Sequence, residues 1–262
     1  MEKLSKVDGV SDSKFYINMA AESPTSRFTA EMLVTLEMFK DSQWEEPVPL
    51  SLFWNGIDYS IARNFLGNFT QAELAQLPID QESTADQHSK LILLLRLLQK
   101  KLDQEEAATS PPGSLYTSNY QQWYRLWQGI YALQDELNLP EAEQTVRMLV
   151  DKTPYKSNPV PSHMLAEHLV KVGKYEEAEW TERPICAWMD ARPHLGPSSP
   201  QALNARRLIA QAVWGQGPSR RSEAEALIAE IHWIVEEMGE GQFAVYQAEE
   251  RRLNREMMAT LR

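Results

Sequence analysis

The sequence predicts an all-α fold. Apolar residues recur every three or four positions along most of its 262 residues, which is the spacing of one helix face. No convincing series of alternating strands with hairpin turns is present. A third observation is a self-similar helix–turn–helix pattern, in which the turn glycines Gly173 and Gly217 lie 44 residues apart.

Composition narrows the class of protein. The 43% of hydrophobic residues suffices for a sizeable core, and 26 basic against 37 acidic residues give a net charge of −11. This acidic balance is spread along the chain and argues against nucleic-acid binding. The single cysteine excludes an internal disulfide framework and fits a reducing compartment. No signal-peptide core or membrane-length apolar run is seen. We therefore expect a cytoplasmic protein without a nucleic-acid or membrane partner.

The first part of the chain is expected to be an arm followed by a helical region. Residues 1–25 are polar, which predicts a flexible N-terminal arm, and residues 26–106 form the N-terminal helical region. Within it, residues 26–41 and 52–66 have helical spacing. Thr70-Gln-Ala-Glu73 has the form of a capping box and predicts a short helix start.

A long helix and a linker follow. Ser83-Thr-Ala-Asp86 is a weaker start signal for a helix that runs to about Glu106 and is apolar nearly all round in its middle. Residues 107–118 combine small residues, Ser/Thr and a Pro-Pro-Gly, and are the predicted linker. The remaining residues, 119–262, form the predicted repeat region.

Regular helix pairs are expected beyond the linker. Ser118-Asn-Tyr-Gln121 has capping-box form, and Ser199-Pro200 supplies an N-cap serine with proline at the first helical position. Helices are predicted from about 119, and over 140–152, 159–172, 174–191, 199–217, 221–238 and 242–261. The last of them should cap the apolar end of the array, or alternatively pair with its copy in a homodimer.

The repeated pattern has a physical basis. Small residues such as Ala166 and Ala210 let the first helix of each pair approach its partner closely, and Ala178 does the same for a second helix. Gly173 and Gly217 are expected to end the first helices by taking positive φ.

This pattern resembles the tetratricopeptide repeat in its longer, kinesin-light-chain variety. The family's linker and first helix are similar to the segment Leu195-Gly196-Pro-Ser-Ser-Pro200, followed by Leu208-Ile-Ala210 and Gln216-Gly217. The sequence most resembles the members of this family found in filamentous fungi. The resemblance spans residues 120–262 and is best over 159–239. It implies a right-handed superhelix of antiparallel helix pairs, preceded by the N-terminal helical extension.

The chain departs from the family pattern at several points. Glu182 stands where the family prefers a large apolar residue. Pro184 should kink or break the second helix of its pair. The 120–152 pair lacks the glycine turn.

The resemblance also implies a binding groove lined by the first helices. The family's groove positions fall on Val160, His163, Glu167, Val170, Lys171, Asn204, Arg207, Gln211, Trp214 and Gly215. Among these, Arg207 is the best anchor for an anionic group, because its fork can make two parallel hydrogen bonds to a carboxylate. The set lacks the fuller Lys/Asn/Arg complement of a carboxylate clamp. The resemblance thus favours a scaffold that holds a peptide or protein partner.

An aromatic-lined pocket is the alternative. Trp123 and Trp127 lie one turn apart and, with Trp214, His163 and Arg207, could line a closed site for a small hydrophobic or anionic ligand. The protein would then be a carrier, or a cofactor-free cyclase or isomerase. Core packing of the tryptophans is equally consistent with their spacing.

Acid–base chemistry could come from His163 with Glu182, or from His168 with Glu167. His163 and His168 lie about 140° apart on a helix and cannot easily share a metal ion. No zinc spacing, phosphate loop or local signature of a nucleophile around Cys186 is present. We therefore expect neither a metal nor a cofactor.

Overall fold

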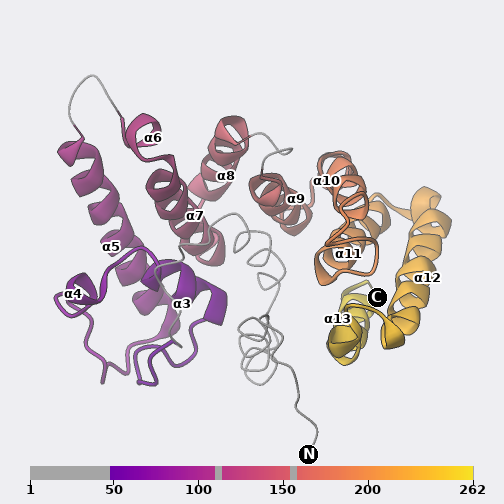
Figure 1. Ribbon diagram of the computed structural model, residues 1–262, viewed down its shortest axis with the longest axis horizontal. Helices are drawn as coiled ribbons and strands as arrows, with labels where there is room; N and C mark the ends of the chain where they lie inside the picture. The colour runs from indigo at the N-terminus through magenta and orange to yellow at the C-terminus, as the bar shows by residue number, and fades with distance from the viewer. Residues whose placement is uncertain (1–47, 110–113, 154–157, 262) are drawn as a thin grey trace, which may run out of the picture.

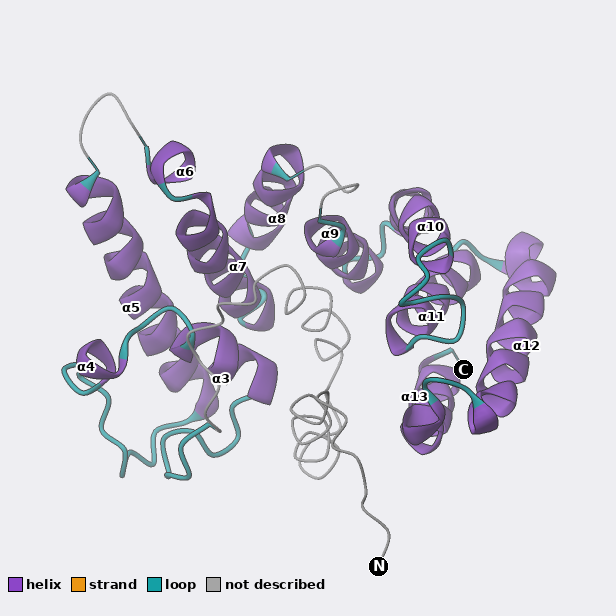
Figure 2. Cartoon of the chain, viewed as in Figure 1, coloured by secondary structure: helices purple, strands orange, loops and turns teal. Residues whose placement is uncertain are grey.

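The computed structural model describes residues 48–109, 114–153 and 158–261 (Figure 1). Helices, turns and loops make up these residues, and no strand occurs in them (Figure 2). The all-α prediction is therefore confirmed for the described part of the chain. The arm expected over 1–25 and the helix expected over 26–41 lie outside it.

The N-terminal region contains α3 (Tyr59–Leu66), α4 (Gln71–Leu74) and α5 (Gln87–Ala108). The Thr70 capping box is confirmed, because Glu73 donates its backbone N–H to Thr70 Oγ1 and accepts the Thr70 backbone N–H at 2.7 Å. Two expected starts were wrong. α3 begins after Asp58, whose carboxylate accepts the Ser60 N–H at 2.8 Å, and α5 begins after Asp86 rather than Ser83.

The predicted linker is shorter than expected. α5 continues to Ala108, and α6 (Leu115–Ser118) fills the end of the 107–118 segment. The capping box predicted at Ser118 is wrong: the side chain of Asn119 caps α7 (Tyr120–Glu136). α5 and α7 pack against each other, so one apolar core continues across the linker.

The rest of the chain is a series of helices close to the predicted bounds. They are α8 (Glu141–Lys152), α9 (Val160–Lys171), α10 (Tyr175–Asp190), α11 (Pro200–Gly215), α12 (Arg221–Glu237) and α13 (Gln247–Thr260). The Ser199 cap is confirmed, since its hydroxyl accepts the Ala202 N–H at 3.2 Å. From α7 onward each helix packs on the next, and α11 also packs on α9 and α13 (Figure 1).

The helix pairs α9–α10 and α7–α8 have the same type of turn between their helices. The α9–α10 turn has Gly173 at φ 81°, with its N–H donating to Val170 O and the Lys174 N–H donating to Leu169 O at 2.8 Å. This pair of hydrogen bonds is the Schellman motif. Gly217 also has positive φ, as expected, but its ψ of −173° differs from the Schellman turn and it leads into a 3-10 turn, Pro218–Arg220.

The α7–α8 pair has the same motif without glycine. Asn138 takes φ 53°, and the Leu139 N–H donates to Gln134 O at 2.9 Å. Asparagine is the residue that most readily replaces glycine in the left-handed region. The pair therefore lacks the glycine but keeps the turn.

Pro184 does not break its helix. α10 runs uninterrupted from Tyr175 to Asp190, with the proline on its exposed side. Proline removes the hydrogen bond to the Trp180 carbonyl. The helix continues because Ile185 and Met189 pack in the apolar cluster shared with α11.

Gly215 is needed for close packing rather than for a groove. A Cβ at this position would lie 2.5 Å from the ring of Tyr175, which follows the α9–α10 turn. Replacing Gly215 with alanine should therefore lower the free energy of unfolding by about 1–3 kcal/mol, as overpacking does, despite the better helix propensity of alanine. Urea unfolding measures this loss. The loss should shrink in a Tyr175→Ala background, and an equal loss there would contradict the packing account.

Candidate functional site

The predicted groove residues differ widely in accessibility. Trp123, His163 and Arg207 are buried. Lys171 is exposed, and the half-buried remainder are Trp127, Glu167, Asn204, Gln211 and Trp214. The structure therefore divides the predicted set into residues inside the protein and residues that a partner could reach.

His163 belongs to a buried polar cluster between α9, α10 and α11, which we call the His163 joint. Its Nδ1 lies 2.7 Å from Glu182 Oε1, and its Nε2 lies 2.9 Å from Asn204 Nδ2. Because the amide nitrogen donates, Nε2 accepts, and the hydrogen on Nδ1 is donated to Glu182. Glu167 flanks the ring, with its carboxylate 3.6 Å from Nε2.

The joint contains a carboxylate without exposed surface. Glu182 is 0% exposed, and its second oxygen, Oε2, has no hydrogen-bond partner. Burial raises the pKa of Glu182, and the neighbouring imidazole of His163 opposes that rise. Removing the imidazole would leave this group in the interior without compensation.

The two acid–base pairings predicted from the sequence had different outcomes. His163 does contact Glu182, as predicted. The other pairing was wrong: His168 turns away from Glu167 and places its Nδ1 2.7 Å from Asp135 of α7. In both contacts an imidazole joins two helices.

Arg207 forms a second buried cluster, the Arg207 joint, between α11 and α13. Its Nε donates to Asn254 Oδ1 at 2.7 Å, and its Nη2 donates to the carboxylate of Glu250. Burial raises the pKa of Glu250, and the guanidinium opposes that rise. Arg207 is therefore not the accessible anchor that the sequence predicted, because its fork holds the last helix.

The two joints lie at the same distance from a turn glycine in α9 and α11. His163 and Arg207 each precede a turn glycine, Gly173 or Gly217, by ten residues. Each reaches the next first helix along the chain, from α9 to α11 and from α11 to α13. The equivalent residue of α7, ten before Asn138, is the buried Gln128. One position in each first helix is thus polar and buried.

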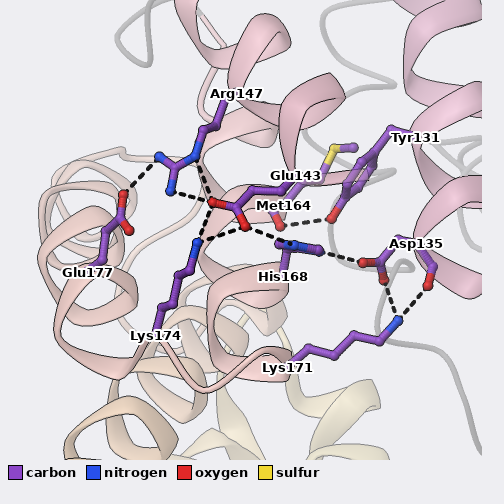
Figure 3. A network of polar contacts seen from close by, with 9 residues as sticks. All are labelled: Tyr131, Asp135, Glu143, Arg147, Met164, His168, Lys171, Lys174 and Glu177. Atoms are coloured by element: carbon purple, nitrogen blue, oxygen red, sulfur yellow. Dashed lines mark hydrogen bonds and ion pairs between the residues drawn. The ribbon is translucent and has the colours of Figure 1, made fainter. Parts of the chain in front are cut away.

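A network of charges runs along the edge formed by α7, α8, α9 and the start of α10 (Figure 3). Lys171 donates to Asp135 Oδ2 at 3.0 Å, beside the His168 contact. Burial alone would raise the pKa of Asp135, but these two hydrogen bonds outweigh it and lower the pKa. The half-exposed side chain of Lys171 is consequently already paired.

Glu143 is the second centre of this network. Its carboxylate accepts from Lys174 Nζ at 2.6 Å and from Arg147, and Arg147 also pairs with Glu177 at 2.8 Å (Figure 3). The hydrogen bond from Lys174 is the main reason why the pKa of Glu143 is lowered. These exposed pairs position the helix ends and contribute little stability each.

The aromatic residues do not meet in one pocket. The ring centroid of Trp123 lies 4.9 Å from that of Tyr116, within the apolar core. Trp214 packs between α11, α12 and α13, and the guanidinium of Arg221 lies 3.6 Å from its ring centroid. Core packing therefore accounts for Trp123, and Trp214 is covered on one face.

Other candidate chemistry is equally limited. A surface pocket of about 350 Å³ lies at the α9–α10 turn, lined by Gly173, Lys174, Tyr175, Glu176, Glu177 and Gln216, none of them a predicted site residue. Burial raises the pKa of the Cys186 thiol to about 12, which leaves it unreactive near neutral pH. Within 48–109, 114–153 and 158–261, no group of metal-binding side chains occurs.

Comparison with protein-family models, curated proteins and solved structures gives no match for this chain. Among the described helices, none is long and apolar enough to cross a bilayer.

Sequence reasoning missed the partners of Arg207. Glu250 and Asn254 lie 43 and 47 residues further along the chain. A signal was nevertheless present, because these two polar residues are four apart and each lies three residues before a member of the apolar stripe, Leu253 or Met257. Two polar residues on the apolar side of a helix indicate that this side contacts a buried polar partner.

The His163 joint predicts a large and pH-dependent effect. Replacing His163 with alanine leaves Glu182 buried and uncompensated, which should cost about 3–5 kcal/mol of unfolding free energy. A raised pKa means that the folded state binds the proton more tightly than the unfolded state. The stability of this variant should therefore fall as pH rises above the unfolded pKa of about 4.3.

Chemical denaturation at several pH values measures both effects. The double change His163→Leu with Glu182→Leu should restore stability and remove the added pH dependence, because the uncompensated carboxylate between α9 and α10 is gone. Replacement of the exposed His232 by alanine is the matched control and should have little effect. A His163→Ala variant with the stability and pH profile of the control would refute the assignment.

Proposed function

We propose that this protein is a helical-repeat scaffold of tetratricopeptide type, in which one face holds a peptide or protein partner. The observation that carries the proposal is the Schellman turn shared by α7–α8 and α9–α10, at Asn138 and Gly173, which lie 35 residues apart. Gly217, 44 residues beyond Gly173, also has positive φ, but its turn has a different backbone conformation. A helix–turn–helix unit of about 34 residues is the period of the tetratricopeptide repeat.

Packing between first helices supports the same proposal. α11 contacts α9 on one side and α13 on the other, in addition to its neighbours in the chain. In a right-handed superhelix of helix pairs, successive first helices stack in this way and line the concave surface. α13 fits the role of a terminal cap, because Arg251 and Arg255 are exposed and Met257 and Leu261 are buried.

The reachable part of the proposed binding face is smaller than the predicted set. Lys171 is exposed, and Glu167, Gln211 and Trp214 are half-buried. These side chains offer a mixed polar and aromatic surface, which suits an extended peptide more than a compact apolar ligand. In this proposal the His163 and Arg207 joints keep the first helices in register and touch no partner.

The pocket alternative has weaker support. Trp123, His163 and Arg207 would have to face a common ligand, and each of them contacts protein groups instead. A cofactor-free cyclase or isomerase is therefore not what the geometry favours. A homodimer through α13 remains a separate prediction, which sedimentation at several concentrations would test.

The binding proposal is tested with peptides selected from a random display library on the full chain. Combined replacement of Lys171 and Gln211 by alanine should weaken their binding about tenfold, equivalent to about 1.4 kcal/mol. Thermal unfolding should change only slightly, because a partly exposed pair such as Lys171–Asp135 contributes little stability. Fluorescence anisotropy measures the affinity.

The matched control is Arg255→Ala, which changes an exposed side chain on α13 and should leave binding unchanged. A loss in the control but not in the double variant would refute the proposed face. Thermal stabilisation by a small metabolite, with no peptide selected, would favour the pocket instead.

A further inference from the structure

α12 presents a tryptophan to solvent. Trp233 is 65% exposed and lies on the side of the helix opposite to Ile231 and Val235, which pack in the core. The exposed residues Ala229 and Ala226 precede it by four and seven positions, and so lie on the same face. The outer face of α12 therefore carries two small side chains, Ala226 and Ala229, followed by the large exposed ring of Trp233.

This face also carries carboxylates without a cation. Residues 221–241 contain six carboxylates and one arginine, and two of the six, Glu223 and Glu230, pair with arginines outside α12. Glu236 is paired with Arg251 at 2.5 Å, whereas Glu237 and Glu240 have no ion-pair partner in the part of the chain that the structure describes. Glu237 follows Trp233 by four positions, which makes the two side chains neighbours on the helix surface.

Two other tryptophans of this protein, Trp188 and Trp214, are each covered by an arginine guanidinium group. The guanidinium of Arg221 lies 3.6 Å from the ring centroid of Trp214, and that of Arg192 lies 4.2 Å from the ring centroid of Trp188. Among the described cations, none covers Trp233. The ring therefore offers a face to a guanidinium from outside the chain, with a carboxylate one turn away.

We propose that the α12 surface, formed by Ala226, Ala229, Trp233 and Glu237 of α12 with Glu240 of the 3-10 turn that follows it, binds an arginine-bearing basic segment of a partner protein. One arginine stacks on the Trp233 ring and pairs with Glu237, while apolar side chains of the segment lie along the two alanines. A lysine binds less well, because it lacks the planar fork that stacks and pairs at the same time. An acidic surface selects such a basic partner and repels an acidic one.

This surface is independent of the proposed binding face. It belongs to a second helix of a pair, whereas Lys171 and Gln211 belong to first helices. Substitutions at one surface leave the other intact, so failure of either proposal is recognised separately.

The test uses the full chain and a labelled, short amphipathic peptide of arginine, leucine and alanine, followed by fluorescence anisotropy at low salt. Replacing Trp233 with alanine, or both Glu237 and Glu240 with glutamine, should weaken binding at least about fivefold. The same peptide with lysine for arginine should bind several-fold more weakly to the unchanged protein.

The matched control is Trp180→Ala, which removes another exposed tryptophan, 78% accessible, from the second helix α10. This control should bind the arginine peptide as the unchanged protein does. No binding of the arginine peptide would overturn the proposal. Equal losses in the Trp180 and Trp233 variants, or equal affinity for the lysine peptide, would also overturn it, because they would indicate unspecific attraction to an acidic protein.

Discussion

The carboxylate of Glu182 has no contact with solvent, and the arrangement of α9, α10 and α11 depends on how that charge is accommodated. Desolvation of a carboxylate costs several kcal/mol unless hydrogen bonds and an opposite dipole or charge compensate it. His163 supplies the compensation from α9, and Asn204 fixes the imidazole from α11. Three helices must therefore keep one relative position, since a small shift would leave the carboxylate alone in the interior. A large apolar residue at position 182 would tolerate small shifts between the helices, because its packing does not depend on the direction of a hydrogen bond.

The Arg207 joint applies the same constraint between α11 and α13. Its guanidinium connects α11 to Asn254 and Glu250 of α13, so the first helices α9, α11 and α13 are linked in sequence by buried polar contacts. His163 and Arg207, which the sequence predicted as ligand-binding residues, hold neighbouring helices instead. The proposed binding face is consequently left with residues beside the joints, such as Lys171 and Gln211, on a surface whose shape the joints determine.

Local signals predicted much of the local structure, although the starts predicted at Ser83 and Ser118 fell at Asp86 and Asn119. The Thr70 capping box, the Ser199 cap and the turn at Gly173 depend on residues within one or two helical turns, and all three form as expected. The turn at Asn138 was missed because asparagine adopts positive φ only when its surroundings favour it. Contacts across the fold were harder to predict. Glu250 lies 43 residues beyond Arg207, and spacing on one helix does not reveal which helix will lie opposite.

The central claim is that the buried joints, rather than apolar packing alone, hold successive first helices together. Amide hydrogen exchange of the full chain with Arg207→Met tests it most directly, since methionine keeps much of the volume and removes the charge. The account predicts that the amides of α13, Gln247–Thr260, lose protection, while those of α8 and α9 keep theirs. Unchanged protection in α13, or an equal loss in every helix, would contradict the claim.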